Sequence, residues 1–137
     1  MKFKNKIIES LKVKKPVFYV STNNFCYEEG KRLRDTWADY IRLDIEHGPF
    51  NSTGIQAFMR GLVGDDNYTN NSQLPAVIAE LPFTGRSLEE VKACMWMAHH
   101  ILATGVHGLL LCHAECEKAA RELVRGIRYP IHTPVDP

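Results

Sequence analysis

The chain has no long apolar run, no excess of charge of either sign and no Cys-x-x-Cys pair. None of its apolar stretches reaches the roughly 18 residues of a transmembrane helix, so we expect no membrane span. The formal net charge is +1, which predicts no overall attraction to nucleic acid or to an anionic membrane. The basic N-terminus lacks the continuous apolar core of a signal peptide. We therefore expect a cytoplasmic protein whose four cysteines are reduced thiols.

Several catalytic motifs are also missing. No Gly-x-Gly-x-x-Gly follows an expected strand, so nothing supports a dinucleotide site. The sequence contains no nucleophile elbow, no phosphate loop and no Ser-His-Asp order. Residues 112–116 (CHAEC) hold zinc-type ligands, but the spacing is Cys-x₃-Cys and no second pair exists. A structural zinc site is therefore disfavoured, and we expect Cys112 to pack as a small apolar residue.

Apolar runs and helical patterns alternate along the 137 residues, a length typical of one domain. Lysines interleaved with apolar residues at helical spacing predict an amphipathic helix within residues 1–15. Four strand–helix pairs are expected over residues 16–130, followed by a tail at 131–137. The expected strands are 17–21, 39–46, 76–81 (ending before Pro82) and 108–111; the expected helices are 25–37, 53–63, one opening at 87, and 115–125. Residues 64–74 are polar and predict a loop.

Helix boundaries follow from short capping patterns. Thr53 with Gln56, and Ser87 with Glu90, fit the capping box that opens a helix. Gly105 fits the position just after the end of the third helix of these pairs. Both tryptophans are most simply interpreted as core residues.

Alternating strands and helices predict a parallel sheet with right-handed crossovers. Four such units fit the first half of a (β/α)₈ barrel or a small doubly wound sheet, and periodicity alone does not choose between them. In both folds the chemistry lies beyond the carboxyl ends of the strands.

The most concentrated set of ionisable residues, 44–47 (DIEH), ends the second expected strand. Strand alternation places Asp44 and Glu46 on one face, opposite the apolar residues of the run. His47 follows at the rim, where a near-neutral pKa would allow proton transfer. The alternative is a structural ion pair between Arg42 and Asp44, with His47 merely closing the loop.

Residues 43–50 (LDIEHGPF) resemble the Asp-x-Glu-His-x-Pro signature that ends the second strand of HpcH/HpaI aldolases, which include 4-hydroxy-2-oxoheptanedioate aldolase. The likeness continues through residues 75–82 and 105–130, so it covers about 17–130. The resemblance implies a (β/α)₈ barrel of which this chain forms the first four units. It also implies a class II aldolase that cleaves or forms 4-hydroxy-2-oxo acids through a pyruvate-type enolate bound to a divalent metal.

The resemblance assigns roles to the charged residues after the second strand. His47 would be the catalytic base, acting through a metal-bound water. Asp44 would orient His47, because a carboxylate fixes the tautomer of a histidine. Glu46 would contribute a supporting charge at the substrate site.

Two further positions are expected to contact substrate. The family commonly places a carboxylate-binding arginine at the end of the third strand, but residues 80–82 (ELP) contain none. Arg86 is the candidate replacement, since a guanidinium binds a carboxylate bidentately; a solvated loop arginine is the alternative. His113 matches a histidine often found at the end of the fourth strand, where it would line the substrate pocket.

The family's metal (Mg²⁺, Mn²⁺ or Co²⁺) is held by carboxylates after the fifth and sixth strands, so we expect no metal ligands in this chain. Three hypotheses follow: the first half of an aldolase, a natural half-barrel that pairs with itself or a second chain, or a non-catalytic half-barrel that binds a keto acid or acts as a scaffold. The expected partners are a small keto acid, an aldehyde, and further copies of the chain or a complementing second half.

Overall fold

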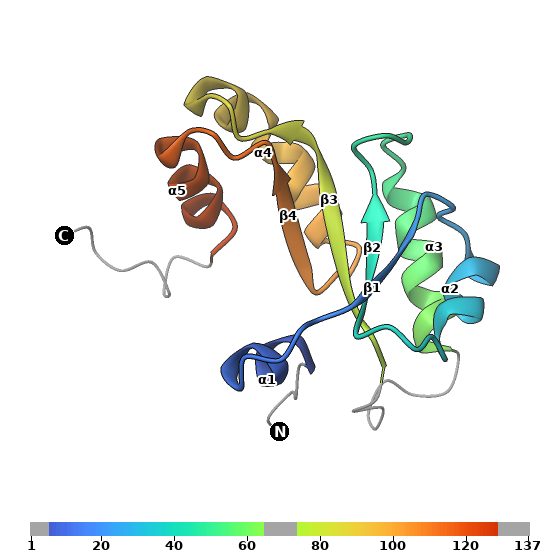
Figure 1. Cartoon of the computed structure of the whole chain (residues 1–137). Coiled ribbons are helices and arrows are strands. Elements are labelled where there is room, and N and C mark those ends of the chain that lie inside the picture. The colour runs from blue at the N-terminus through green and yellow to red at the C-terminus, as the bar shows by residue number, and fades with distance from the viewer. Residues whose placement is uncertain (1–5, 65–73, 129–137) are drawn as a thin grey trace.

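The computed structural model describes residues 6–64 and 74–128, in which strands and helices alternate. The elements are α1 (Lys6–Lys12), β1 (Tyr19–Thr22), α2 (Tyr27–Leu33), β2 (Tyr40–Asp44), α3 (Ser52–Val63), β3 (Ala76–Thr84), α4 (Leu88–Leu102), β4 (Gly108–Cys112) and α5 (Glu117–Gly126), as Figure 1 shows. The four predicted strand–helix pairs are confirmed. Most of the loop predicted at 64–74, and the whole tail at 131–137, lie outside the described residues. No helix in the described ranges has the length and apolar character needed to cross a membrane.

The sheet is parallel throughout and its strand order is β1-β2-β3-β4. A doubly wound sheet reverses its strand order at a switch point, whereas a (β/α)₈ barrel adds each strand beside the preceding one. Each strand here is joined to its neighbour through a helix, and right-handed crossovers place such helices on one face. The fold is therefore α/β, with the arrangement of the first half of a (β/α)₈ barrel.

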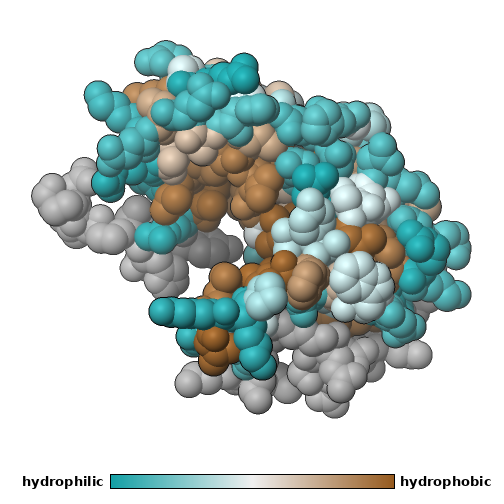
Figure 2. Space-filling view, in the orientation of Figure 1, coloured by the Kyte–Doolittle hydropathy of each residue, from teal (hydrophilic) through white to brown (hydrophobic). Residues whose placement is uncertain are grey.

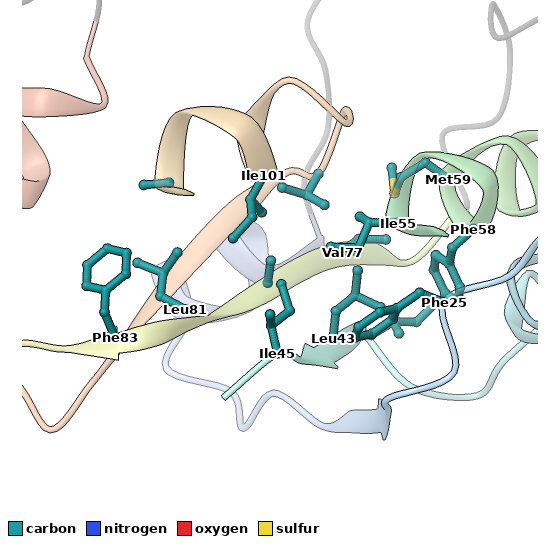
Figure 3. Close-up of a cluster of buried hydrophobic side chains, with 14 of the residues drawn as sticks. Phe25, Leu43, Ile45, Ile55, Phe58, Met59, Val77, Leu81, Phe83 and Ile101 are labelled. Atoms are coloured by element: carbon teal, nitrogen blue, oxygen red, sulfur yellow. The ribbon is translucent and has the colours of Figure 1, made fainter. Parts of the chain in front are cut away.

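The core lies between the sheet and its helices, as the close-up in Figure 3 shows. The alternation predicted for residues 39–46 is confirmed, because Ile41, Leu43 and Ile45 are completely buried. Fully buried partners come from β3, α3 and α4: Val77, Leu81, Ile55, Phe58, Leu62, Val91 and Ile101. Each such side chain contributes about 1.5–3 kcal/mol by leaving water, so this layer fixes the position of β2 and β3.

The opposite face of the sheet is open and carries polar and aromatic side chains. Tyr19 and Tyr40 lie with ring centroids 5.3 Å apart, and the Arg42 guanidinium lies 5.2 Å from the centre of the Tyr19 ring. The strand register places Glu80 beside Asp44 on this face. Figure 2 shows hydrophobic surface around a hollow in the middle of the molecule, bordered by hydrophilic groups.

The third strand is longer than its sequence pattern predicts. β3 continues through Pro82 to Thr84, so the prediction that Pro82 closes the strand is wrong. The pairing of β3 with β4 shifts register between Glu80 and Thr84. Proline has no N–H for the ladder and is tolerated at such irregularities, which explains how the strand passes it.

Neither predicted capping box forms in full, although Ser87 does cap α4. α3 is capped by Asn51, whose side chain accepts a hydrogen bond of 2.8 Å from the Gly54 N–H, so Thr53 lies inside the helix. At α4 the Ser87 hydroxyl accepts from the Glu90 N–H at 3.1 Å, as predicted. The carboxylate of Glu90 does not complete that box but accepts bonds of 2.8 and 2.7 Å from the N–H and hydroxyl of Thr84. The end of β3 is thereby tied to the start of α4.

Other local predictions need correction. Gly105 has φ 94°, the left-handed value that favours glycine, but lies two residues after the cap of α4 at Ala103 rather than one. Trp37 and Trp96 are 76% and 51% exposed, so neither is a core residue. Trp96 instead contacts Phe50 edge to face, with ring centroids 5.6 Å apart.

Candidate functional site

The carboxyl ends of β2, β3 and β4 bring most of the predicted site residues to one edge of the sheet. Because the strands are parallel, residues that are far apart in the sequence become neighbours there. Asp44 ends β2 and is followed by Glu46 and His47, while His113 follows β4. Arg86 lies between β3 and α4 and points elsewhere, as described below.

Asp44 holds the imidazole of His47. Nδ1 of His47 lies 2.9 Å from Oδ1 and 3.1 Å from Oδ2 of Asp44, and the His47 backbone N–H donates to the same carboxylate at 3.0 Å. An ionised carboxylate only accepts hydrogen bonds, so Nδ1 must carry a proton. In neutral His47 the lone pair is then on Nε2, which is the nitrogen available to act as a base.

The charges of this pair stabilise each other. Burial alone would raise the pKa of Asp44, but the hydrogen bonds from the His47 backbone and ring, together with the charges of His47 and Arg42, outweigh it and lower that pKa. The hydrogen bond to Asp44 and its negative charge raise the pKa of His47, with smaller contributions from Glu46 and Glu80. His47 is 69% exposed, so its Nε2 is open to a ligand.

Glu46 lies between two histidines. Its carboxylate oxygens are 3.8 Å from Nε2 of His47 and 3.2 Å from Nε2 of His113. His113 has φ 45°, a left-handed backbone conformation that costs a non-glycine residue about 1–2 kcal/mol. The strained backbone and the contact with Glu46 together fix His113 at the edge where His47 lies.

Glu80 belongs to this site although sequence reasoning did not select it. It is the one charged residue among the buried residues of the described chain, and its Oε1 lies 3.3 Å from the Arg42 guanidinium. Its Oε2 is buried and has no hydrogen-bond partner. Arg42 also lies 3.9 Å from Asp44, so the ion pair considered as an alternative role for Asp44 is present but is shared with Glu80. A carboxylate inside the apolar run 76–81 was the signal that could have identified Glu80.

Cys112 is buried, as expected for a small packing residue, but its surroundings are not purely apolar. One donor atom from each of Glu46, Glu80 and Cys112 forms a group whose members all lie within 4.8 Å of one another. Burial, followed by the nearby Glu46 and Glu80 carboxylates, raises the pKa of Cys112 to about 12. The thiol therefore keeps its proton at neutral pH in the structure as it stands.

Arg86 is placed differently from the other predicted residues. Its Nε lies 3.3 Å from Oε1 of Glu115, and both side chains are more than half exposed. An exposed pair of this kind contributes little to stability, so Arg86 is free to exchange Glu115 for another carboxylate. Its role in substrate binding stays a prediction.

No family model matches the chain, and no curated protein matches its sequence. Among solved structures, it is similar to an HpcH/HpaI aldolase/citrate lyase family protein from Burkholderia cenocepacia J2315, with a TM-score of 0.70 and 19% sequence identity. The match covers 93% of this chain and 44% of that protein. The chain therefore has the fold of an HpcH/HpaI aldolase/citrate lyase family protein, over less than half of that protein's length.

Proposed function

We propose that this chain supplies the proton-transfer residues of a carbon–carbon lyase that cleaves or forms 4-hydroxy-2-oxo acids. The observation that supports it is the His47–Asp44 pair at the carboxyl end of β2, in a fold shared with an aldolase/citrate lyase family protein. In this proposal the small-molecule partners are a keto acid and an aldehyde. The pair is suited to general base catalysis, because one ring nitrogen is held while the other faces outward.

In the cleavage direction, Nε2 of His47 accepts the proton of the hydroxyl on C4 of the substrate. The electrons of that O–H bond form the carbonyl of the leaving aldehyde, and the C3–C4 bond breaks. The electron pair of that bond passes to the keto acid fragment as an enolate. The imidazolium of His47 then gives its Nε2 proton to C3 of the enolate, which returns His47 to its neutral form. Asp44 keeps Nδ1 protonated and stabilises the imidazolium that forms.

The family's divalent ion, when bound, supplies electrostatic stabilisation of the enolate. Mg²⁺ and Mn²⁺ prefer all-oxygen sites, and Mg²⁺ demands near-octahedral geometry. Among the described residues, the two clusters that could hold an ion each include a nitrogen or sulfur donor: Asp44, His47 and Glu80 in one, and Glu46, Glu80 and Cys112 in the other. These clusters do not fit a hard ion of that kind.

The proposal is tested by measuring pyruvate released from a 4-hydroxy-2-oxo acid by the full chain, with Mg²⁺ or Mn²⁺ present. His47→Ala should lower the turnover rate by about 10²–10⁴-fold, the usual contribution of a general base. His100→Ala removes an exposed histidine on α4 and should leave the rate unchanged.

Turnover that persists in His47→Ala would remove His47 as the base. A chain that binds pyruvate but releases none from the substrate would instead be a binding module, and the lyase proposal would be rejected.

A further inference from the structure

Three groups able to bind a metal ion converge at the carboxyl end of the sheet from three different segments. Glu46 follows β2, Glu80 lies in β3 and Cys112 ends β4. A carboxylate oxygen from each glutamate and the sulfur of Cys112 all lie within 4.8 Å of one another. Two of these residues are almost completely buried, Glu80 at 5% and Cys112 at 6% exposure.

One carboxylate oxygen of Glu80, Oε2, is buried without a hydrogen-bond partner. The side chain as a whole is only 7% exposed. An unsatisfied buried polar atom costs about 1–3 kcal/mol, and more when the group is charged. Arg42 is near, but it approaches the other oxygen, Oε1, and also interacts with Asp44.

The charge balance favours a cation at this position. Asp44, Glu46 and Glu80 bring three carboxylates to one edge of the sheet. In the part of the chain that the structure describes, Arg42 is the permanent cation that contacts them, and the imidazoles of His47 and His113 contact Asp44 and Glu46. Arg86 does not contribute, because it is paired with Glu115. Buried carboxylates are stable when they are paired with a cation or coordinate a metal.

We propose that Glu46, Glu80 and Cys112 form a binding site for a zinc-type divalent ion. Tetrahedral coordination with bonds of about 2.0 Å to oxygen and 2.3 Å to sulfur separates ligand atoms by about 3.3–3.5 Å. A contraction of at most about 1.3–1.5 Å from the present limit of 4.8 Å achieves this spacing, within the reach of rotation about the glutamate side chains. Coordination by Cys112 releases its thiol proton to solvent.

The donor set selects the kind of ion. A thiolate with two carboxylates suits Zn²⁺ or Co²⁺, whereas Mg²⁺ and Ca²⁺ prefer oxygen ligands alone. Three protein ligands leave a fourth position open, as in zinc sites that bind water or a substrate. The site is distinct from the metal site that the family resemblance implies, whose carboxylates follow later strands, and it does not depend on lyase activity.

Cobalt provides a direct test, because a Co²⁺–thiolate bond gives a charge-transfer band in the near ultraviolet. Reduced, metal-free full chain is titrated with Co²⁺, and Zn²⁺ is then added in competition. We expect the band to saturate at one ion per chain and to be abolished by Zn²⁺. Cys112→Ser should remove the band, and Glu80→Gln and Glu46→Gln should each weaken Co²⁺ binding at least tenfold.

Cys116→Ser is the matched control, because it removes a thiol four residues away that belongs to neither candidate cluster. It should leave the band and the affinity unchanged. Circular dichroism checks that each variant is folded; if Glu80→Gln does not fold, Cys112→Ser and Glu46→Gln retain the test. The proposal is overturned if the wild-type chain gives no band, if the band survives Cys112→Ser, or if Cys116→Ser removes it. Since the readout is binding, failure of the lyase assay would not affect it.

Discussion

The close crossing of α2 and α3 predicts that adding a single methyl group at this crossing greatly lowers the stability of the chain. A Cβ atom at Gly61 would lie 1.9 Å from the Tyr27 carbonyl oxygen and 3.1 Å from the Lys31 nitrogen. At Gly30, on the facing helix, it would lie 2.0 Å from the Phe58 carbonyl oxygen. Both clashes are with backbone of the partner helix, so no side-chain rotation relieves them.

Gly61→Ala must therefore move the two helices apart by more than 1 Å, since ordinary contacts begin near 3.4 Å. Overpacking of this kind costs about 1–3 kcal/mol. The usual gain from replacing a helical glycine by alanine, about 0.5–1 kcal/mol, opposes that cost. Because the clash is with backbone, we take the upper overpacking cost of about 3 kcal/mol; after the helix gain of about 1 kcal/mol, the free energy of unfolding should fall by about 2 kcal/mol. For a chain of this length, with an unfolding entropy of about 2.1 cal/mol/K per residue, the melting temperature should fall by about 7 °C.

Gly126→Ala is the matched control. Gly126 also lies in a helix, but its added Cβ would meet Sδ and Cε of Met95 at 2.7 Å, and that flexible thioether can move aside. Thermal unfolding followed by circular dichroism should show a change within about 1 kcal/mol, as for volume changes that a core can absorb. If Gly61→Ala were as stable as the wild type, or more stable than Gly126→Ala, the close helix crossing would be refuted.

Three further changes test local contacts. Asp44→Asn should lower the pKa of His47, because the carboxylate that raises it is lost; an unchanged NMR titration of the His47 ring would contradict the contact. Burial lowers the pKa of His107, whose Nδ1 accepts a bond from the Val77 N–H at 2.9 Å. The contribution of neutral His107 to the free energy of unfolding should therefore be fully present above about pH 6.5. It should be lost as the pH falls through the pKa of His107 in the folded chain. His107→Asn keeps an acceptor without a titration, so chemical denaturation across this range should show a shallower loss. Ser87→Ala should destabilise the chain by about 1 kcal/mol, whereas Ser87→Asp should retain most of the cap; equal losses would refute the capping role.

The strand positions were predictable because a strand with one buried face alternates apolar and polar residues along the sequence. In residues 39–46 the apolar positions are the buried ones, so both the strand and its faces were predicted correctly. β3 was less predictable, because Pro82 normally marks a strand end and its tolerance depends on a register shift against β4. Trp96 was wrongly predicted to be buried because helical spacing shows which residues share a face, but not whether another element covers that face. Trp37 lies beyond the helix predicted to contain it, because α2 ends at Leu33 rather than at residue 37.

The contact between Asp44 and His47 joins residues three positions apart, within one turn of chain after β2. A contact of this range is set by local backbone geometry; the local pattern left its role open, and the family resemblance suggested it. Glu80 and Cys112 could not be placed in the same way. Their approach to Glu46 requires the alignment of three strands, which no local pattern specifies.

The proposed proton transfer depends on a contact between residues close in the sequence, whereas the proposed metal site depends on residues from three segments of the chain. The His47–Asp44 pair depends mainly on the turn that follows β2, so small shifts of the neighbouring strands should leave it intact. The Glu46–Glu80–Cys112 group spans the β3–β4 pairing and includes the stretch where that pairing shifts register. A disturbance of the β3–β4 ladder should therefore impair metal binding before it alters the contact between His47 and Asp44. The two sites adjoin, because Glu46 lies 3.8 Å from Nε2 of His47 and Arg42 contacts both Asp44 and Glu80. Loss of metal binding with retention of the His47–Asp44 contact would therefore indicate a change in the β3–β4 pairing rather than in the turn after β2.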